Sequence, residues 1–189
     1  IAITGSCGKT SIYSIVINII KKKHKILYQK INFNNEIGIS KTILKINYSH
    51  EYAIVELGAT KIGDIDYLMK IIQPDISIIS NIIPVHINSF KTIKNIFITK
   101  YEIFFSLLKN KTCIVNLDDF FSDKWLKLLK YYNVICYSIN RKSDLYIKNI
   151  KKLKDIFIIT LVILNKIISI RIHKKTIYNV NNVIASYII

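Results

Sequence analysis

Short apolar runs and longer amphipathic stretches alternate along the chain up to about residue 143. The apolar runs have the length of buried strands, whereas the stretches between them repeat apolar residues with the spacing of a helix. The predicted strands cover residues 1–3, 25–29, 52–57, 75–80, 112–117 and 134–138, and the predicted helices cover residues 10–22, 64–72, 93–108 and 123–132. This alternation favours a mostly parallel sheet with helices on both faces, and we therefore predict an α/β fold.

The pattern changes from Asp144 onward, where short strand-like runs follow one another without helices between them. These runs cover residues 145–150, 156–164 and 167–172, and polar turns join them. They predict a small antiparallel β appendage near the C-terminal end, and a last helix is predicted to begin near Asn179. Residues 31–38 are predicted to form a polar loop.

Residues 4–11 read Thr-Gly-Ser-Cys-Gly-Lys-Thr-Ser and join the first predicted strand to the first predicted helix. Gly5 and Gly8 let backbone N–H groups close around an anion, and the positive end of the helix points at the same place. Lys9 adds a positive charge, and the Thr10 hydroxyl is placed to bind magnesium. The pattern favours a contracted phosphate-binding loop (P-loop), and the alternative is a glycine turn that binds nothing.

Polar side chains follow the other predicted strands, at the edge of a parallel sheet where ligands usually bind. Glu56 has apolar neighbours, so it needs either a bound cation or a salt-bridge partner. His86 is predicted either to bind a ligand or to pack within a loop. Asn116 and Asp118 come at the end of the predicted strand 112–117, and Asp118 is predicted either to face the ligand or to cap the next helix. From its spacing alone, Lys100 is a solvated lysine on a helix.

Length and composition narrow the class of protein. The chain has 189 residues, of which 51% are hydrophobic, and this is enough for one domain with a sizeable core. Its formal net charge is +16. The lysines are spread along the whole chain and only two arginines occur, so we predict no nucleic-acid partner. The three separated cysteines suit a reducing, cytoplasmic location, and no apolar run is long enough to span a membrane. We expect a monomer.

Taken together, these segments resemble the central ATP-binding domain of the Mur ligases, the ATP-dependent amide-bond-forming enzymes of peptidoglycan and cell wall synthesis. Residues 4–11 are similar to the contracted phosphate loop of that family, and residues 179–182 to its asparagine motif. Residues 34–38, 56–59 and 100–104 most resemble the members that add D-alanyl-D-alanine to UDP-MurNAc-tripeptide. The resemblance covers nearly the whole chain, residues 1–189, and implies a central domain without the amino-terminal UDP-binding and carboxy-terminal ligase domains, inactive by itself.

The resemblance also implies cofactors, substrates and site residues. The cofactors are ATP and Mg²⁺, and the substrates are UDP-MurNAc-tripeptide and D-alanyl-D-alanine, joined through an acyl phosphate. It assigns catalytic roles to Lys9, His86 and Lys100, and places the muramoyl peptide near Asn34 and Asn35. Metal ligands are implied at Thr10, Glu56, His86 and, if carbamylated, Lys100. The nucleotide-binding residues that it implies are Gly5, Ser6, Cys7, Gly8, Lys9, Thr10, Ser11, Asn116, Asp118, Asn179 and Asn182.

Two other functions stay open on the sequence alone. Folylpolyglutamate synthetases share this central fold and loop, although residues 34–38 and 56–59 favour the muramoyl ligases. A basic nucleic-acid-binding or scaffold domain with a relic phosphate loop would instead carry aromatic residues among its cations on one face. The chain has no such stripe, and Arg141 and Arg171 stand alone.

Overall fold

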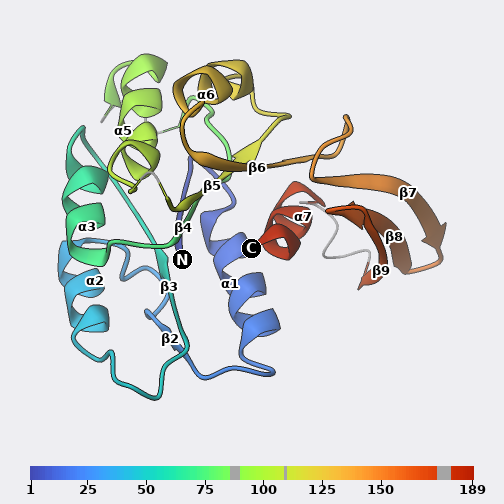
Figure 1. Cartoon of the computed structure of the whole chain (residues 1–189), viewed down its shortest axis with the longest axis horizontal. Coiled ribbons are helices and arrows are strands. Elements are labelled where there is room, and N and C mark those ends of the chain that lie inside the picture. The colour runs from blue at the N-terminus through green and yellow to red at the C-terminus, as the bar shows by residue number, and fades with distance from the viewer. Residues whose placement is uncertain (86–89, 109, 174–179) are drawn as a thin grey trace.

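The computed structural model describes residues 1–85, 90–108, 110–173 and 180–189 of the chain. Within these ranges, the strands form a nine-stranded sheet in the order β2-β3-β1-β4-β5-β6-β7-β8-β9 (Figure 1). The strands are β1 (Ala2–Thr4), β2 (Ile26–Tyr28), β3 (Tyr52–Glu56), β4 (Ile76–Ile79), β5 (Thr112–Asn116), β6 (Asn133–Ser138), β7 (Leu145–Leu153), β8 (Ile156–Ile163) and β9 (Lys166–His173). The first six strands are parallel to one another, which confirms the predicted fold class.

Helices cover both faces of the parallel strands. The helices are α1 (Lys9–Ile20), α2 (Glu36–Ile43), α3 (Asp64–Ile72), α5 (Ile93–Phe105), α6 (Ser122–Leu128) and α7 (Val180–Ile188). Helices α1 and α7 lie side by side on one face, and the others lie on the opposite face (Figure 1). Side chains alternate between the faces along each strand, so Ala2 enters one core and Ile3 the other. Both faces are therefore buried.

Strands β7, β8 and β9 confirm the antiparallel part predicted near the C-terminal end, and they continue the same sheet. Strand β7 pairs with β6 in parallel through Tyr137 with Leu145 and Ser138 with Tyr146. Strands β7, β8 and β9 then pair as an antiparallel meander, whose inner face packs against α7. Hydrophobic pattern alone predicts each strand but not this pairing between β6 and β7.

One helix lies where a polar loop was predicted. Helix α2 begins at Glu36, and the Asn35 side chain caps it by accepting a hydrogen bond from the Gly38 N–H at 2.9 Å. The loop prediction for residues 36–38 is therefore wrong, because asparagine followed by glutamate is also a helix-start signal.

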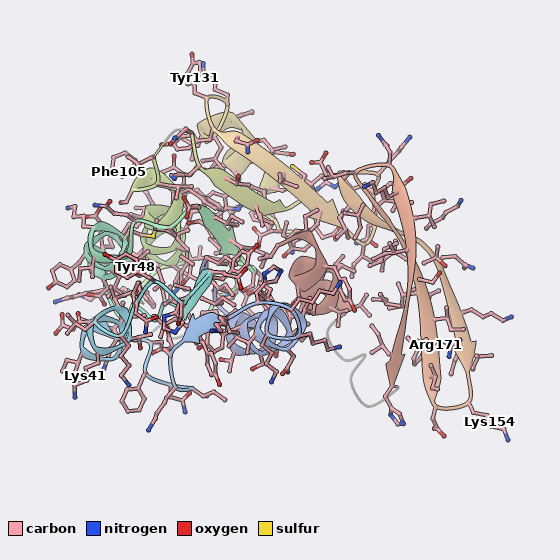
Figure 2. All side chains as sticks on the ribbon, turned by 60° about the horizontal axis from the view of Figure 1, so that its bottom comes forward. Lys41, Tyr48, Phe105, Tyr131, Lys154 and Arg171 are labelled. Carbon is pink, nitrogen blue, oxygen red and sulfur yellow. The ribbon has the colours of Figure 1, made fainter. Side chains whose placement is uncertain are left out.

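The surface charge is dispersed, as the sequence indicates. Lys41 lies at one end of the molecule and Lys154 at the other, on the turn between β7 and β8 (Figure 2). Among the described residues, no helix combines the length and the apolar character needed to cross a bilayer.

Candidate functional site

The glycine-containing loop between β1 and α1 lies at the carboxyl edge of the sheet. Gly5 and Gly8 have φ angles of 144° and 83°, which residues with side chains rarely adopt. Gly8 is the N-cap of α1, and no described side chain caps that end of the helix. The Lys9 ammonium folds back over the loop and donates to the carbonyls of Gly5 at 2.9 Å and Ser6 at 3.2 Å. The loop thus places the Lys9 ammonium group beside an uncapped helix N-terminus.

Residues at the end of β4 hold this loop in place. The N–H groups of Ser6 and Cys7 donate to the main-chain and side-chain oxygens of Asn81, each at 2.9 Å. The Ser80 hydroxyl donates to the Cys7 carbonyl at 2.5 Å, and the Ser6 hydroxyl donates to the Ile83 carbonyl at 3.0 Å. Two loop N–H groups are therefore used within the protein, and the start of α1, with Thr10 and Ser11, is the part left for an anion.

Glu56 ends β3 beside this loop and is only 3% exposed. Its carboxylate accepts a hydrogen bond from the Asn34 amide at 3.0 Å, and the side-chain amide of Gln29 bonds to its main-chain N–H and carbonyl. No ion pair joins Glu56 to a residue within the described ranges, so the alternative of a salt-bridged glutamate is not supported there. A buried carboxylate held by a neutral amide is suited to a bound cation.

Lys9 and Lys100 share a pocket of about 230 Å³ that Asn34 and Phe90 also line. Lys100 is 4% exposed, so the interpretation as a solvated lysine is wrong. Burial, together with the nearby positive charge of Lys9, lowers the pKa of Lys100 from 10.5 to about 8. Burial also lowers the pKa of Lys9, although the Glu56 carboxylate acts in the opposite direction. Two lysines with weakened affinity for protons therefore face one cavity.

A larger pocket of about 640 Å³ adjoins the first. Asn34 and the loop of residues 58–60 line both pockets, whereas Asn35, Asp64 and Tyr67 line only the larger one. Gly58 permits the close approach of this loop, since a Cβ there would lie 2.7 Å from the Asn34 side-chain oxygen. Both asparagines that the resemblance assigned to the peptide side thus lie at this double pocket.

The remaining nucleotide-side candidates are more dispersed. Asn182 of α7 packs against Gly8, and its side-chain Nδ2 is buried without a hydrogen-bond partner among the described residues. The Asn116 side-chain amide donates to the carbonyl of Ser80 at 3.2 Å, and the hydroxyl of the same Ser80 contacts the loop at Cys7. Asp118 instead holds the turn after β6, where its carboxylate accepts bonds from Ser138, Ile139 and Asn140. It does not cap the following helix, whose N-cap is Phe121.

His86 and Asn179 lie outside the described residues. Within the part of the chain that the structure describes, no cluster of three His, Cys, Asp or Glu side chains is arranged to hold a metal. Three buried residues that the sequence reasoning missed hold the site together: Gln29, Ser80 and Glu102. Their roles depend on contacts between distant segments, although Ser80 and Asn81 did fall at a predicted strand end.

Comparisons with known proteins show the family to which this chain belongs. The family described as the Mur ligase middle domain matches residues 3–189. The UDP-N-acetylmuramoyl-tripeptide–D-alanyl-D-alanine ligase of Buchnera aphidicola subsp. Acyrthosiphon pisum (strain APS) is 40% identical over 153 residues, which cover 80% of this chain and 34% of that relative. The chain thus spans about a third of the length of this curated relative.

Solved structures share the fold. A crystal structure of MurF from Acinetobacter baumannii superposes with a TM-score of 0.89 at 28% identity, covering 99% of this chain and 41% of that one. The MurF ligase from Thermotoga maritima in complex with ADP gives 0.81 at 25% identity, covering 98% of this chain and 43% of that one. A mutant of L. casei FPGS, at 10% identity and a TM-score of 0.64 over 99% of this chain and 57% of that one, shares the fold alone.

The family indicated by residues 4–11, 34–38 and 179–182 is therefore confirmed by the match over residues 3–189 and by the shared fold. The chain belongs to the Mur ligase middle domain family.

Proposed function

We propose that the protein containing this chain is an ATP-dependent ligase that joins D-alanyl-D-alanine to UDP-MurNAc-tripeptide. The names of the relatives support this substrate pair, since the 40% identical protein from Buchnera is such a ligase. The chain supplies the central nucleotide-binding part, and domains that bind the UDP group and the incoming dipeptide complete the enzyme.

The observation that carries this proposal is the pocket that Lys9 and Lys100 share beside the uncapped start of α1, with the buried Glu56 close enough to act on the pKa of Lys9. The phosphates of ATP would lie at that helix end, where backbone N–H groups and Lys9 offset their negative charge. The ADP in the Thermotoga maritima MurF structure supports a nucleotide ligand for this fold. Ser6, Cys7, Gly8 and Ser11 would surround the phosphates, while Asn116, Asp118, Asn179 and Asn182 would lie on the nucleotide side.

The oxygen donors fit a magnesium ion. The Thr10 hydroxyl and the Glu56 carboxylate are hard oxygen ligands of the kind that Mg²⁺ prefers, and Glu56 is buried and forms no ion pair with another described residue. When bound, the ion would neutralise phosphate charge during transfer. A second ion would be held by His86 and a carbamylated Lys100.

The environment of Lys100 favours carbamylation. Its pKa of about 8 leaves part of the amine neutral near neutral pH, and the neutral amine attacks CO₂ with loss of one proton to form a carbamate. The product is an anion in place of a cation next to Lys9, so the repulsion between the two ammonium groups becomes an attraction.

The peptide substrate would occupy the larger pocket. Asn34 and Asn35 line it, and the adjoining lysine pocket would receive the substrate carboxylate beside the γ-phosphate. That carboxylate attacks the γ-phosphate to give an acyl phosphate and ADP, and the amine of D-alanyl-D-alanine then displaces phosphate. The role of the chain is to orient these groups and offset their charge, and no nucleophilic side chain is required.

The folylpolyglutamate alternative has weaker support. The L. casei FPGS mutant shares only the fold at 10% identity, whereas the muramoyl ligase from Buchnera is 40% identical. The basic-scaffold alternative is also weakened, because Lys100 is buried and Lys9 half-buried at one pocket, and neither is part of an exposed basic face.

The test uses the full-length protein, with Lys9→Ala and the matched control Lys154→Ala, which removes the same charge from the exposed turn between β7 and β8. Titration calorimetry measures Mg·ATP binding, and a phosphate-release assay is run with UDP-MurNAc-tripeptide and D-alanyl-D-alanine, together and separately. We expect release that needs both substrates, falls by at least about 10²-fold in Lys9→Ala and is unchanged in Lys154→Ala. ATP binding with phosphate release that does not require both substrates would favour folate or another acceptor as the substrate. The absence of ATP binding would favour the basic-scaffold alternative.

A further inference from the structure

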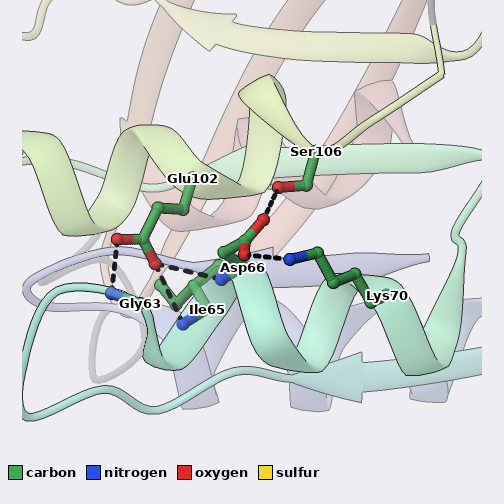
Figure 3. A network of polar contacts seen from close by, with 6 residues as sticks. All are labelled: Gly63, Ile65, Asp66, Lys70, Glu102 and Ser106. Atoms are coloured by element: carbon green, nitrogen blue, oxygen red, sulfur yellow. Dashed lines mark hydrogen bonds and ion pairs between the residues drawn. The ribbon is translucent and has the colours of Figure 1, made fainter.

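Helix α3 is capped by a carboxylate from another helix. Glu102 of α5 is 8% exposed and accepts hydrogen bonds from the N–H groups of Gly63 at 2.7 Å, Ile65 at 3.1 Å and Asp66 at 3.0 Å (Figure 3). Its carboxylate therefore takes the position that the side chain of an N-cap residue normally occupies.

The α3 sequence cannot supply this cap by itself. The N-cap of α3 is Gly63, which has no side chain and a φ of 95°, whereas the N-caps of α2 and α5 are Asn35 and Thr92, which are extended and cap their own helices. Three N–H groups at the α3 N-terminus thus depend on one side chain 36 to 39 residues away in sequence. A charge at a helix N-terminus also interacts favourably with the helix dipole.

The capped end of α3 continues the wall of the candidate site. The loop of residues 58–63 lines the larger pocket, and its first three residues also line the lysine pocket. Within the loop, one Asp64 oxygen accepts bonds from the Thr60 N–H at 2.9 Å and the Lys61 N–H at 3.1 Å. Glu102 therefore ties this wall to the helix that carries Lys100.

We propose that Glu102 is a positioning residue that fixes the wall of the larger pocket for the muramoyl peptide. This inference rests on the proposed ligase function. The phosphate loop does not depend on Glu102, because Ser80 and Asn81 hold that loop. Loss of the cap therefore weakens peptide binding and leaves ATP binding unchanged.

The experiment compares Glu102→Gln, Glu102→Asp and Ser106→Ala in the full-length protein. In Glu102→Gln the amide NH₂ faces N–H donors, so at least one of them loses its acceptor, whereas Glu102→Asp keeps the charge with a shorter reach. Ser106→Ala is the matched control, because Ser106 also joins α5 to α3, through Asp66 at 2.5 Å, one turn farther from the pockets (Figure 3).

Steady-state kinetics and hydrogen exchange give separate readouts. For Glu102→Gln we expect the KM for UDP-MurNAc-tripeptide to rise by about five- to tenfold, with the KM for ATP changed by less than about twofold and faster exchange of the amides of residues 60–66. Glu102→Asp should give a smaller rise, and Ser106→Ala none.

Equal changes in both KM values, or equal effects of Glu102→Gln and Ser106→Ala, would overturn the proposal and leave Glu102 with a purely structural role. A wild-type protein without ligase activity would instead contradict the proposed function. In that case the exchange of residues 60–66 still tests the cap: unchanged exchange in Glu102→Gln would refute it.

Discussion

Two glycines with the same backbone conformation offer a matched test of the contact between α7 and the loop that joins β1 to α1. Gly8 and Gly63 are both N-caps in the left-handed region, with φ angles of 83° and 95°. An added Cβ at Gly63 meets no atom within 4 Å, whereas at Gly8 it would lie 2.4 Å and 2.7 Å from the side-chain oxygen and nitrogen of Asn182. The substitutions Gly8→Ala and Gly63→Ala therefore share a backbone cost and differ in the steric one.

The expected magnitudes follow from these two terms. An alanine in the left-handed conformation costs about 1–2 kcal/mol, which applies to both variants. Asn182 is 4% exposed, so its displacement by the new methyl group resembles overpacking of a core and costs about 1–3 kcal/mol more in Gly8→Ala. With a urea m-value of roughly 2–3 kcal/mol/M, the midpoint of Gly8→Ala should lie roughly 0.3–1.5 M below that of Gly63→Ala.

The assay is urea denaturation of the 189-residue chain, followed by the fluorescence of its one tryptophan. The double variant Gly8→Ala with Asn182→Ala removes the steric conflict, so its cost relative to Asn182→Ala should fall to that of Gly63→Ala. Equal midpoints for the two single variants, or an undiminished cost in the double variant, would refute the reasoning.

Three further predictions concern buried groups. Because the pKa of Lys100 is lowered from 10.5 to about 8, the folded chain binds fewer protons than the unfolded chain between these pH values. The free energy of unfolding, relative to that of Lys100→Met, should therefore rise with pH over this range by up to about 3 kcal/mol in CO₂-free buffer. Denaturation curves at pH 7.5 and 10.5 measure this change, and a constant difference between the two proteins would contradict it. Trp125→Ala should lower the free energy of unfolding by about 3–5 kcal/mol in circular-dichroism melts. The Trp125 side chain is 2% exposed, and its ring stacks on that of Phe97 with 4.3 Å between the ring centroids. A loss below about 1 kcal/mol would mean that the core is packed differently. Gln29→Leu should cost about 1–3 kcal/mol because it leaves the buried N–H and carbonyl of Glu56 unpaired, and an unchanged urea midpoint would argue against that pairing.

The sequence predicts the parallel half of the fold well because its signals are local. Helix α3 begins and ends at the predicted residues, since acidic residues fill its first turn and its apolar residues lie on one face. Residues 4–11 likewise locate the loop between β1 and α1, because glycines at positive φ leave a direct trace in the sequence.

The missed features are those that depend on contacts between distant segments. Glu102 reads as an ordinary helical glutamate, and only the packing of α5 against α3 makes it a cap. Gln29 similarly follows a strand and gives no sign that its amide pairs with Glu56. The spacing around Lys100 predicts a solvated lysine, because spacing indicates a helix face but not what covers that face, and the side chain is buried.

The position of β1 in the sheet has a consequence for how the chain folds. Strand β1 lies between β3 and β4, so Ala2 pairs with Val55 and Ser77, which lie far along the chain. The meander of β7, β8 and β9, by contrast, pairs neighbours in sequence and closes through short turns, which favours early formation. Because the Ser6 and Cys7 N–H groups bond to Asn81, the loop between β1 and α1 can be completed only after β4 has docked beside β1. The candidate site should therefore be among the last parts of the molecule to form, and a phosphate ligand would slow unfolding without accelerating folding.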